Sequence, residues 1–92
     1  ISFNIIRAIM GLRKRILRIK MPNEWEYPIE EFTETATKDF DFELISARRK
    51  TPHPSRHASS YVVEFFALDE EFVEIEHLFY KCAEDMVRRR NL

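Results

Sequence analysis

Glycine occurs only once among the 92 residues, at Gly11. Average usage of about 7% would place about six glycines in a chain of this length. Glycine supplies the positive φ that many tight turns and phosphate-binding loops require, so the sequence excludes glycine-rich phosphate loops and most tight turns of that kind. The P-loop, Rossmann and nucleophile-elbow motifs are all missing from the sequence.

The length and the apolar content predict one domain over residues 1–92 with a single modest core, because 45% of the residues are hydrophobic. A domain of this size buries only about two-thirds of its unfolded surface and is marginally stable alone, so it gains from a partner. One cysteine excludes an internal disulfide framework. It fits a reducing compartment, and no secretory signal is visible, so we expect an intracellular protein that is not secreted.

The N-terminal residues form a basic, acid-free segment with the character of a transit peptide. The first residue is Ile1 rather than methionine, so the chain is a fragment, a processed mature protein or an expressed piece. A removed presequence would not be present, and we therefore expect residues 1–20 to belong to the fold.

Charge is segregated into blocks along the chain, although the net charge is only −1. Residues 1–20 and 46–60 are basic and hold no acid, whereas residues 21–45 and 61–87 hold eight acids each against one lysine each. Three arginines follow at 88–90. Such blocks either neutralise one another in the fold or present basic patches to a partner.

Hydrophobic periodicity predicts helices at both ends of the chain and a hairpin between them. The expected elements are a basic amphipathic helix over 2–20, an acidic segment over 23–38 with a short helix over 28–37, a hairpin over 39–68, and a helix over 69–91. In the hairpin, strands over 39–49 and 59–68 flank the proline-containing loop 50–58. Asp69 is the expected N-cap of the last helix.

These elements predict a small two-layer α+β domain ordered helix, short helix, antiparallel β-hairpin, helix. The last helix would cover one face of the hairpin and the first helix the other. Strand 59–68 is apolar on both faces, so it should be more buried than strand 39–49. It is also the edge expected to accept a strand from a second copy or a partner.

The main functional hypothesis is a non-enzymatic protein-interaction module, acting as a small subunit or adaptor of a larger assembly or as a homo-oligomer. The apolar face of helix 2–20 is too broad for burial on one side, and strand 59–68 adds further apolar surface. The expected interface residues are Ile6, Met10, Leu17, Tyr61, Val63 and Phe65.

The alternative hypothesis is a nucleic-acid-binding protein that contacts phosphates through the basic hairpin loop 48–57 and the basic face of helix 2–20. The candidate phosphate contacts are Arg7, Lys14, Arg15, Arg18, Arg48, Arg49, Lys50 and Arg56. Against it, the isoelectric point is near 6.3 and the flanking segments are acidic. Membrane binding by helix 2–20 is disfavoured against packing of that helix on the sheet.

Side chains capable of catalysis do not form a recognisable set. Cys82 lies on the apolar stripe of the last helix and His77 on another face, which disfavours a nucleophilic pair. His53 and His57 flank a proline-rich loop without further ligands, which disfavours a zinc site. We therefore expect no enzymatic activity, no metal and no cofactor.

Overall fold

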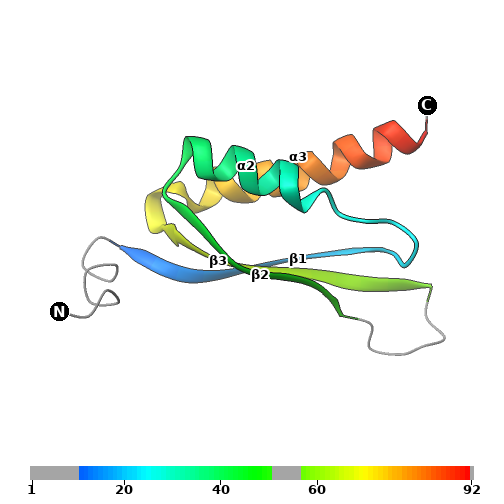
Figure 1. Cartoon of the computed structure of the whole chain (residues 1–92), viewed down its shortest axis with the longest axis horizontal. Helices are drawn as coiled ribbons and strands as arrows, with labels where there is room; N and C mark the ends of the chain where they lie inside the picture. The colour runs from blue at the N-terminus through cyan, green and yellow to red at the C-terminus, as the bar shows by residue number, and fades with distance from the viewer. Residues whose placement is uncertain (1–10, 51–56, 92) are drawn as a thin grey trace.

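The computed structural model describes residues 11–50 and 57–91 and forms a small α+β domain (Figure 1). Its elements in chain order are β1 (Leu12–Pro22), α2 (Ile29–Asp39), β2 (Phe42–Lys50), β3 (Ala58–Leu68), the 3₁₀ turn η1 (Asp69–Glu71) and α3 (Phe72–Arg90). The predicted α+β class is confirmed. The two strands of the predicted hairpin, the short helix and the last helix lie close to their predicted ranges.

The first element is a strand where the sequence pattern predicted a helix, so the predicted helix 2–20 is wrong over residues 12–20. Gly11, at φ 80°, provides the left-handed turn residue immediately before β1. Leu17 and Met21 are buried while Arg18 and Lys20 are exposed, which is the period-two alternation of a strand. The apolar spacing in 12–20 also satisfied a helical period, and pairing with β3 decided between the two. Residues 2–10 lie outside the described part of the chain.

The sheet has three antiparallel strands in the order β1-β3-β2. Strand β3 is therefore central, and the prediction that strand 59–68 is an open edge is wrong. In the central position, the backbone groups of β3 pair with a neighbouring strand on each side, so β3 has no free edge. Within the described residues, the edges of the sheet are β1 and β2.

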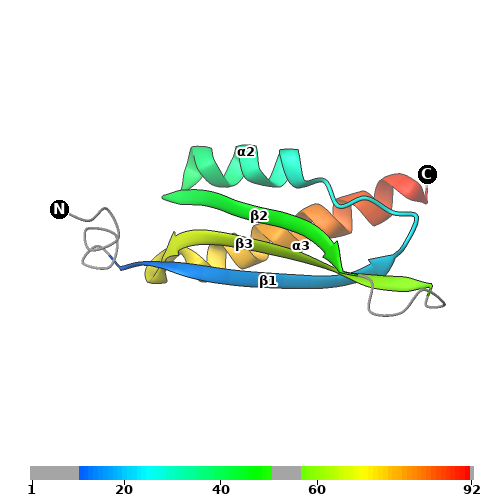
Figure 2. The ribbon, with the colours of Figure 1, turned by 60° about the horizontal axis from the view of Figure 1, so that its bottom comes forward.

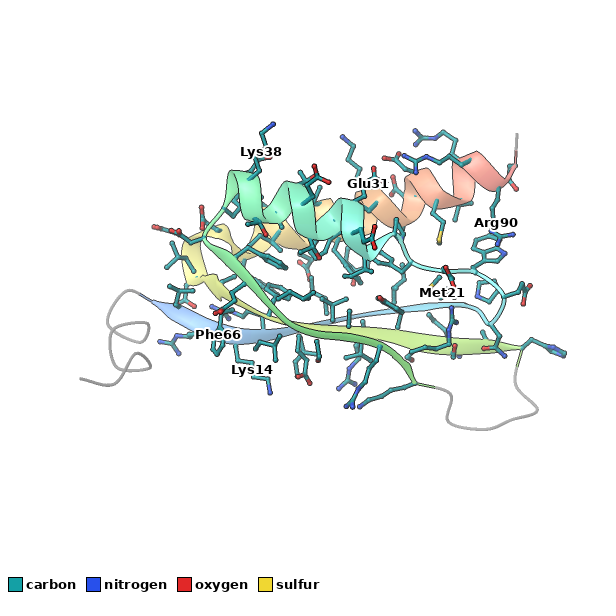
Figure 3. All side chains as sticks on the ribbon, viewed as in Figure 1. Lys14, Met21, Glu31, Lys38, Phe66 and Arg90 are labelled. Atoms are coloured by element: carbon teal, nitrogen blue, oxygen red, sulfur yellow. The ribbon has the colours of Figure 1, made fainter. Side chains whose placement is uncertain are left out.

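Both helices lie on the same face of the sheet, as Figure 2 shows. The expected arrangement, with one helix on each face, is wrong because residues 12–22 form part of the sheet. Lys14 and Phe66 project from the face opposite the helices (Figure 3). Among the described residues, no helix covers this face, which we call the open face.

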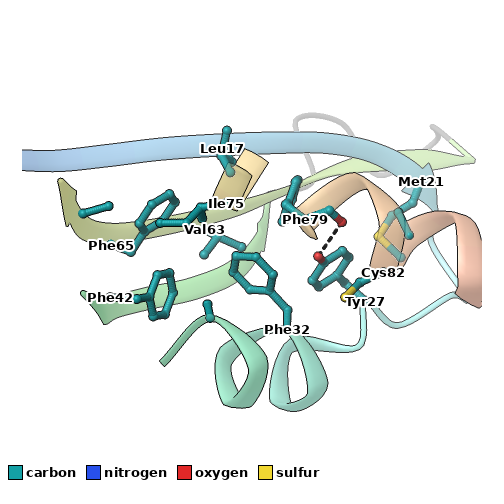
Figure 4. Packing of buried hydrophobic residues seen from close by; sticks show 13 residues of the cluster. Leu17, Met21, Tyr27, Phe32, Phe42, Val63, Phe65, Ile75, Phe79 and Cys82 are labelled. Atoms are coloured by element: carbon teal, nitrogen blue, oxygen red, sulfur yellow. Dashed lines mark hydrogen bonds between the residues drawn. The ribbon is translucent and has the colours of Figure 1, made fainter. Parts of the chain in front are cut away.

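Aromatic side chains fill the core between the sheet and the helices (Figure 4). Phe32 from α2 and Phe79 from α3 are fully buried and pack edge to face, with ring centroids 5.5 Å apart. Tyr27 packs against Phe79 at 4.7 Å, and its hydroxyl donates a 2.7 Å hydrogen bond to the Phe79 carbonyl. The loop before α2 is thereby fastened to α3.

A β-bulge interrupts the pairing of β2 with β3. Leu44 pairs with Phe65 and Ser46 with Glu64, which leaves Ile45 as an extra residue that is exposed. One extra residue reverses the inward and outward alternation of the strand beyond it. Arg48 and Lys50 therefore project on the open face, although strict alternation from Phe42 and Leu44 would turn them toward the helices.

Helix α3 begins later than predicted, and Asp69 is not its N-cap. The cap residue is Glu71, without a side-chain cap hydrogen bond. Asp69 instead forms ion pairs with Arg15 and with Arg13, the latter at 3.4 Å. Its carboxylate therefore connects η1 to β1.

Candidate nucleic-acid interface

Four basic side chains surround the central strand on one half of the open face. Arg18 of β1 and Arg48 of β2 both pair with Val62, and Lys20 and Lys50 both pair with Ser60. Neighbouring strands lie about 4.8 Å apart, so the flanking residues of one row are roughly 10 Å apart and the two rows about 7 Å apart. We call Arg18, Lys20, Arg48 and Lys50 the basic quartet.

The basic quartet is exposed to solvent, and the structure gives it no ion pair with another described residue. Val62 is only 3% exposed although it lies on the open face and outside the core cluster. This burial is consistent with cover by the aliphatic stems of the arginines that flank it. The four cationic groups of the quartet therefore surround one buried apolar residue, Val62, on the open face.

Acidic residues are nearly confined to the rest of the molecule. Only Glu43 and Glu64 have register positions on the open face, both toward its other end. Glu64 is partly neutralised by Lys14 at 3.5 Å and accepts a hydrogen bond from the Ser46 hydroxyl at 3.3 Å. The remaining acids of the described residues lie in α2, α3, η1 and the connecting loops. The fold thus separates a basic half-face from a helical layer that holds most of the acids, together with Lys38, Lys81 and the arginines at 88–90.

Two of the predicted phosphate contacts point toward the helices instead. The Arg15 guanidinium pairs with Asp69 and lies 5.0 Å from the centroid of the Phe72 ring. Arg49 donates hydrogen bonds to the Ser59 hydroxyl at 2.7 Å, to the Pro22 carbonyl at 3.2 Å and to the Trp25 carbonyl. Both arginines are therefore engaged within the fold.

The other predicted contacts have mixed positions. Lys14, Arg18, Arg48 and Lys50 are exposed on the open face. Arg7 and Arg56 lie outside the described residues. Sequence reasoning missed Lys20, because a helical period placed it within an apolar arc. A period of two along 14–20 would have grouped it with Lys14 and Arg18.

Arg49 holds the chain that leaves β1, so its loss should destabilise the fold. Replacing Arg49 with alanine removes hydrogen bonds to two backbone carbonyls and one hydroxyl. Hydrogen bonds to a charged group contribute about 1.5–3 kcal/mol, and we expect a total loss of roughly 2 kcal/mol because the side chain is only part-buried. Urea unfolding measures this loss. Lys50→Ala, at the next residue of β2, which is exposed, should change stability by less than about 0.5 kcal/mol, and equal losses in the two variants would contradict the assignment.

The four predicted protein-interface residues that the structure describes do not form an exposed surface. Leu17, Val63 and Phe65 are buried in the core between the sheet and the helices. Tyr61 stacks on Tyr27 with ring centroids 5.2 Å apart. Ile6 and Met10 lie outside the described residues. Leu17, Val63 and Phe65 were expected to lie in a protein interface. Their side chains face the helical layer instead, so they do not form an exposed interface.

The reactive side chains are dispersed. Cys82 is buried, as predicted. Its burial is the main cause that raises the pKa of the thiol, and the nearby Glu31 and Asp85 carboxylates raise it further, which disfavours the thiolate. His77 is exposed on α3, and His53 lies outside the described residues. Within 11–50 and 57–91, no three histidine, cysteine or acidic side chains are grouped to hold a metal ion. Neither described helix is long and apolar enough to cross a membrane.

Comparison of the chain with protein-family models, curated protein sequences and solved structures finds no match.

Proposed function

We propose that this protein binds nucleic acid through the sheet face opposite its helices. The observation that carries the proposal is the basic quartet, in which Arg18 faces Arg48 and Lys20 faces Lys50 across β3. Arginine and lysine contacts to phosphate oxygens supply most of the sequence-independent affinity of nucleic-acid-binding proteins. The position of the quartet on strands rather than on a loop favours a fixed spacing of its charges.

The distribution of acids removes the objection that the sequence raised. The acidic segments flank the basic ones in sequence, but α2 and α3 lie on the other side of the sheet (Figures 1 and 2). A polyanion approaching the open face meets the quartet first, while the acidic layer is turned away. Such charge separation favours one orientation of approach even when the net charge is close to zero.

The open face offers few groups that could read bases. Phe66 is the only aromatic residue among its register positions, and it lies at the end away from the quartet. Proteins that recognise single-stranded RNA by sequence usually stack several bases on aromatic side chains. The proposal is therefore contact with the phosphate backbone, with little preference for sequence.

The test is the salt dependence of binding by the wild-type protein to an RNA hairpin, a single-stranded oligonucleotide and a DNA duplex. Fluorescence anisotropy between about 50 and 300 mM KCl should give a linear loss of log affinity with log salt, at roughly one unit of slope per phosphate contact. Vesicles containing anionic lipid provide the comparison with another anionic surface. Binding to vesicles but to none of the three nucleic acids would contradict the proposal, as would nucleic-acid binding that does not depend on salt.

The adaptor role predicted from the sequence remains a prediction.

A further inference from the structure

An apolar groove of about 350 Å³ runs between the end of β1 and the solvent side of α3. Ile19 and Met21 line it from β1, Trp25 from the following loop, and Tyr80, Met86 and Val87 from α3. Tyr80 and Val87 are 40% and 38% exposed, which is high for large apolar side chains on a small domain. The groove meets the basic quartet at Lys20, and the strand edge beside the groove also carries Arg18 of the quartet.

The groove lies beside a strand edge with backbone groups available for pairing. Among the described residues, β1 pairs with β3 alone, so its other side is an edge of the sheet. The Tyr80 hydroxyl donates a 3.5 Å hydrogen bond to the Arg18 carbonyl, so α3 reaches the backbone of β1. Alternate residues of an antiparallel strand direct their N–H and C=O groups to the same side. Ile16 and Lys20 therefore share the orientation of Arg18 toward this edge.

We infer that this edge binds an extended segment of a partner protein whose side chains alternate between apolar and acidic. A strand added beside β1 would place every second side chain over Ile19, Met21 and the exposed flank of α3. The intervening side chains would lie on the open face beside Lys14, Arg18 and Lys20. Opposite charges on adjacent strands stabilise pairing, so Arg18 and Lys20 favour acids in the added strand, whereas Lys14 is already paired with Glu64.

The same charges argue against a second copy of this chain. Antiparallel pairing of two β1 strands about Leu17 would place Lys14 opposite Lys20 of the other copy, at both ends of the contact. Like charges directly opposite one another destabilise a strand pair. Lysines on an edge strand are also a common means of preventing self-association. A partner segment that alternates apolar and acidic side chains fits both the apolar groove and the basic side chains of β1.

The probe is a seven-residue peptide with the sequence Leu-Glu-Val-Asp-Ile-Glu-Leu, blocked at both ends. Trp25 is the only tryptophan and lines the groove, with the Arg90 guanidinium 4.9 Å from its ring centroid, so its fluorescence reports occupancy. We expect saturable binding with a change in Trp25 emission. A peptide with lysine at the three acidic positions should bind at least about tenfold more weakly. A peptide of the original composition with its apolar residues grouped should also bind more weakly, because it cannot divide its side chains between the two faces.

Two variants test the groove and the edge separately. Val87→Glu adds a carboxylate to the groove and should weaken binding at least about tenfold, whereas Val73→Glu, on the same helix outside the groove and 57% exposed, should leave it unchanged. Ile16→Pro removes one outward N–H from the edge and should weaken binding, with folding checked by circular dichroism. Absence of saturable binding to the wild type, equal affinity for the acidic and lysine peptides, or equal effects of the two valine variants would each overturn the inference. Concentration-dependent dimerisation of the wild type that Val87→Glu abolishes would also overturn it, in favour of a second copy.

Discussion

Replacing Phe79 with alanine is expected to reduce the free energy of unfolding by about 3–5 kcal/mol. Phe79 has no solvent-exposed surface and contacts the rings of Tyr27 and Phe32 at 4.7 and 5.5 Å. Its removal leaves a cavity at the point where α3, α2 and the loop before α2 meet, and a core this small has few ways to collapse onto it. Small domains are stable by only about 5–15 kcal/mol, so this loss would remove most of the stability of a domain at the lower end of that range.

Chemical denaturation monitored by circular dichroism gives the measurement. Val73→Ala is the matched control, since Val73 lies on the same helix and is 57% exposed. It should change stability by no more than about 0.5 kcal/mol. A loss below about 1 kcal/mol for Phe79→Ala would mean that the aromatic cluster is not the core of this domain.

Changing the basic quartet to glutamine is expected to weaken nucleic-acid binding uniformly across sequences while leaving the fold intact. The four side chains are exposed and carry the charges on which the proposed interaction with phosphate depends. Removing one cation that binds a phosphate should reduce the salt slope by about one, so the full variant should reduce it by up to about four. Anisotropy at several salt concentrations measures the slope, and thermal unfolding verifies that the variant is folded.

The matched control removes the same number of positive charges from the helical layer. Lys38, Lys81, Arg88 and Arg89 are exposed on α2 and α3, and glutamine at all four gives the same net charge as the quartet variant. The ion pairs of Arg88 with Asp85 and of Arg89 with Glu31 are exposed and contribute little stability. If both variants lose affinity equally, binding depends on net charge and not on the open face, and the proposed site is wrong.

Much of the local structure could be predicted from the sequence. The apolar stripe of the last helix, including Phe79 and Cys82, has a period that only a helix satisfies over such a length, and α3 follows it. The aromatic and β-branched run at 59–68 predicted a buried strand, which is β3. Periodicity failed at 12–20, because Leu12, Ile16 and Ile19 follow a helical spacing although the segment pairs as a strand.

Three residues of the candidate site were predictable from the sequence, whereas Lys20 and the arrangement of the four were not. Arg18, Arg48 and Lys50 were candidates from charge alone, yet Arg15 and Arg49 have the same charge and face the helices. The difference is which face of the sheet each residue occupies. This face alternates along a strand, and in β2 the alternation is reversed by the bulge at Ile45. The face that each residue occupies cannot be assigned until the pairing of the strands is known.

The sequence by itself predicted one modest apolar core, a buried hydrophobic strand, a long C-terminal helix and charges in alternating blocks. These are local properties, since period, composition and turn chemistry act over a few residues. The tertiary structure alone decided that β3 is the central strand, that both helices cover one face, and that the basic blocks of β1 and β2 meet on the other. Those outcomes depend on pairing between segments far apart in the chain, such as Arg18 with Val62. The periodicity of one segment does not specify which other strand that segment pairs with.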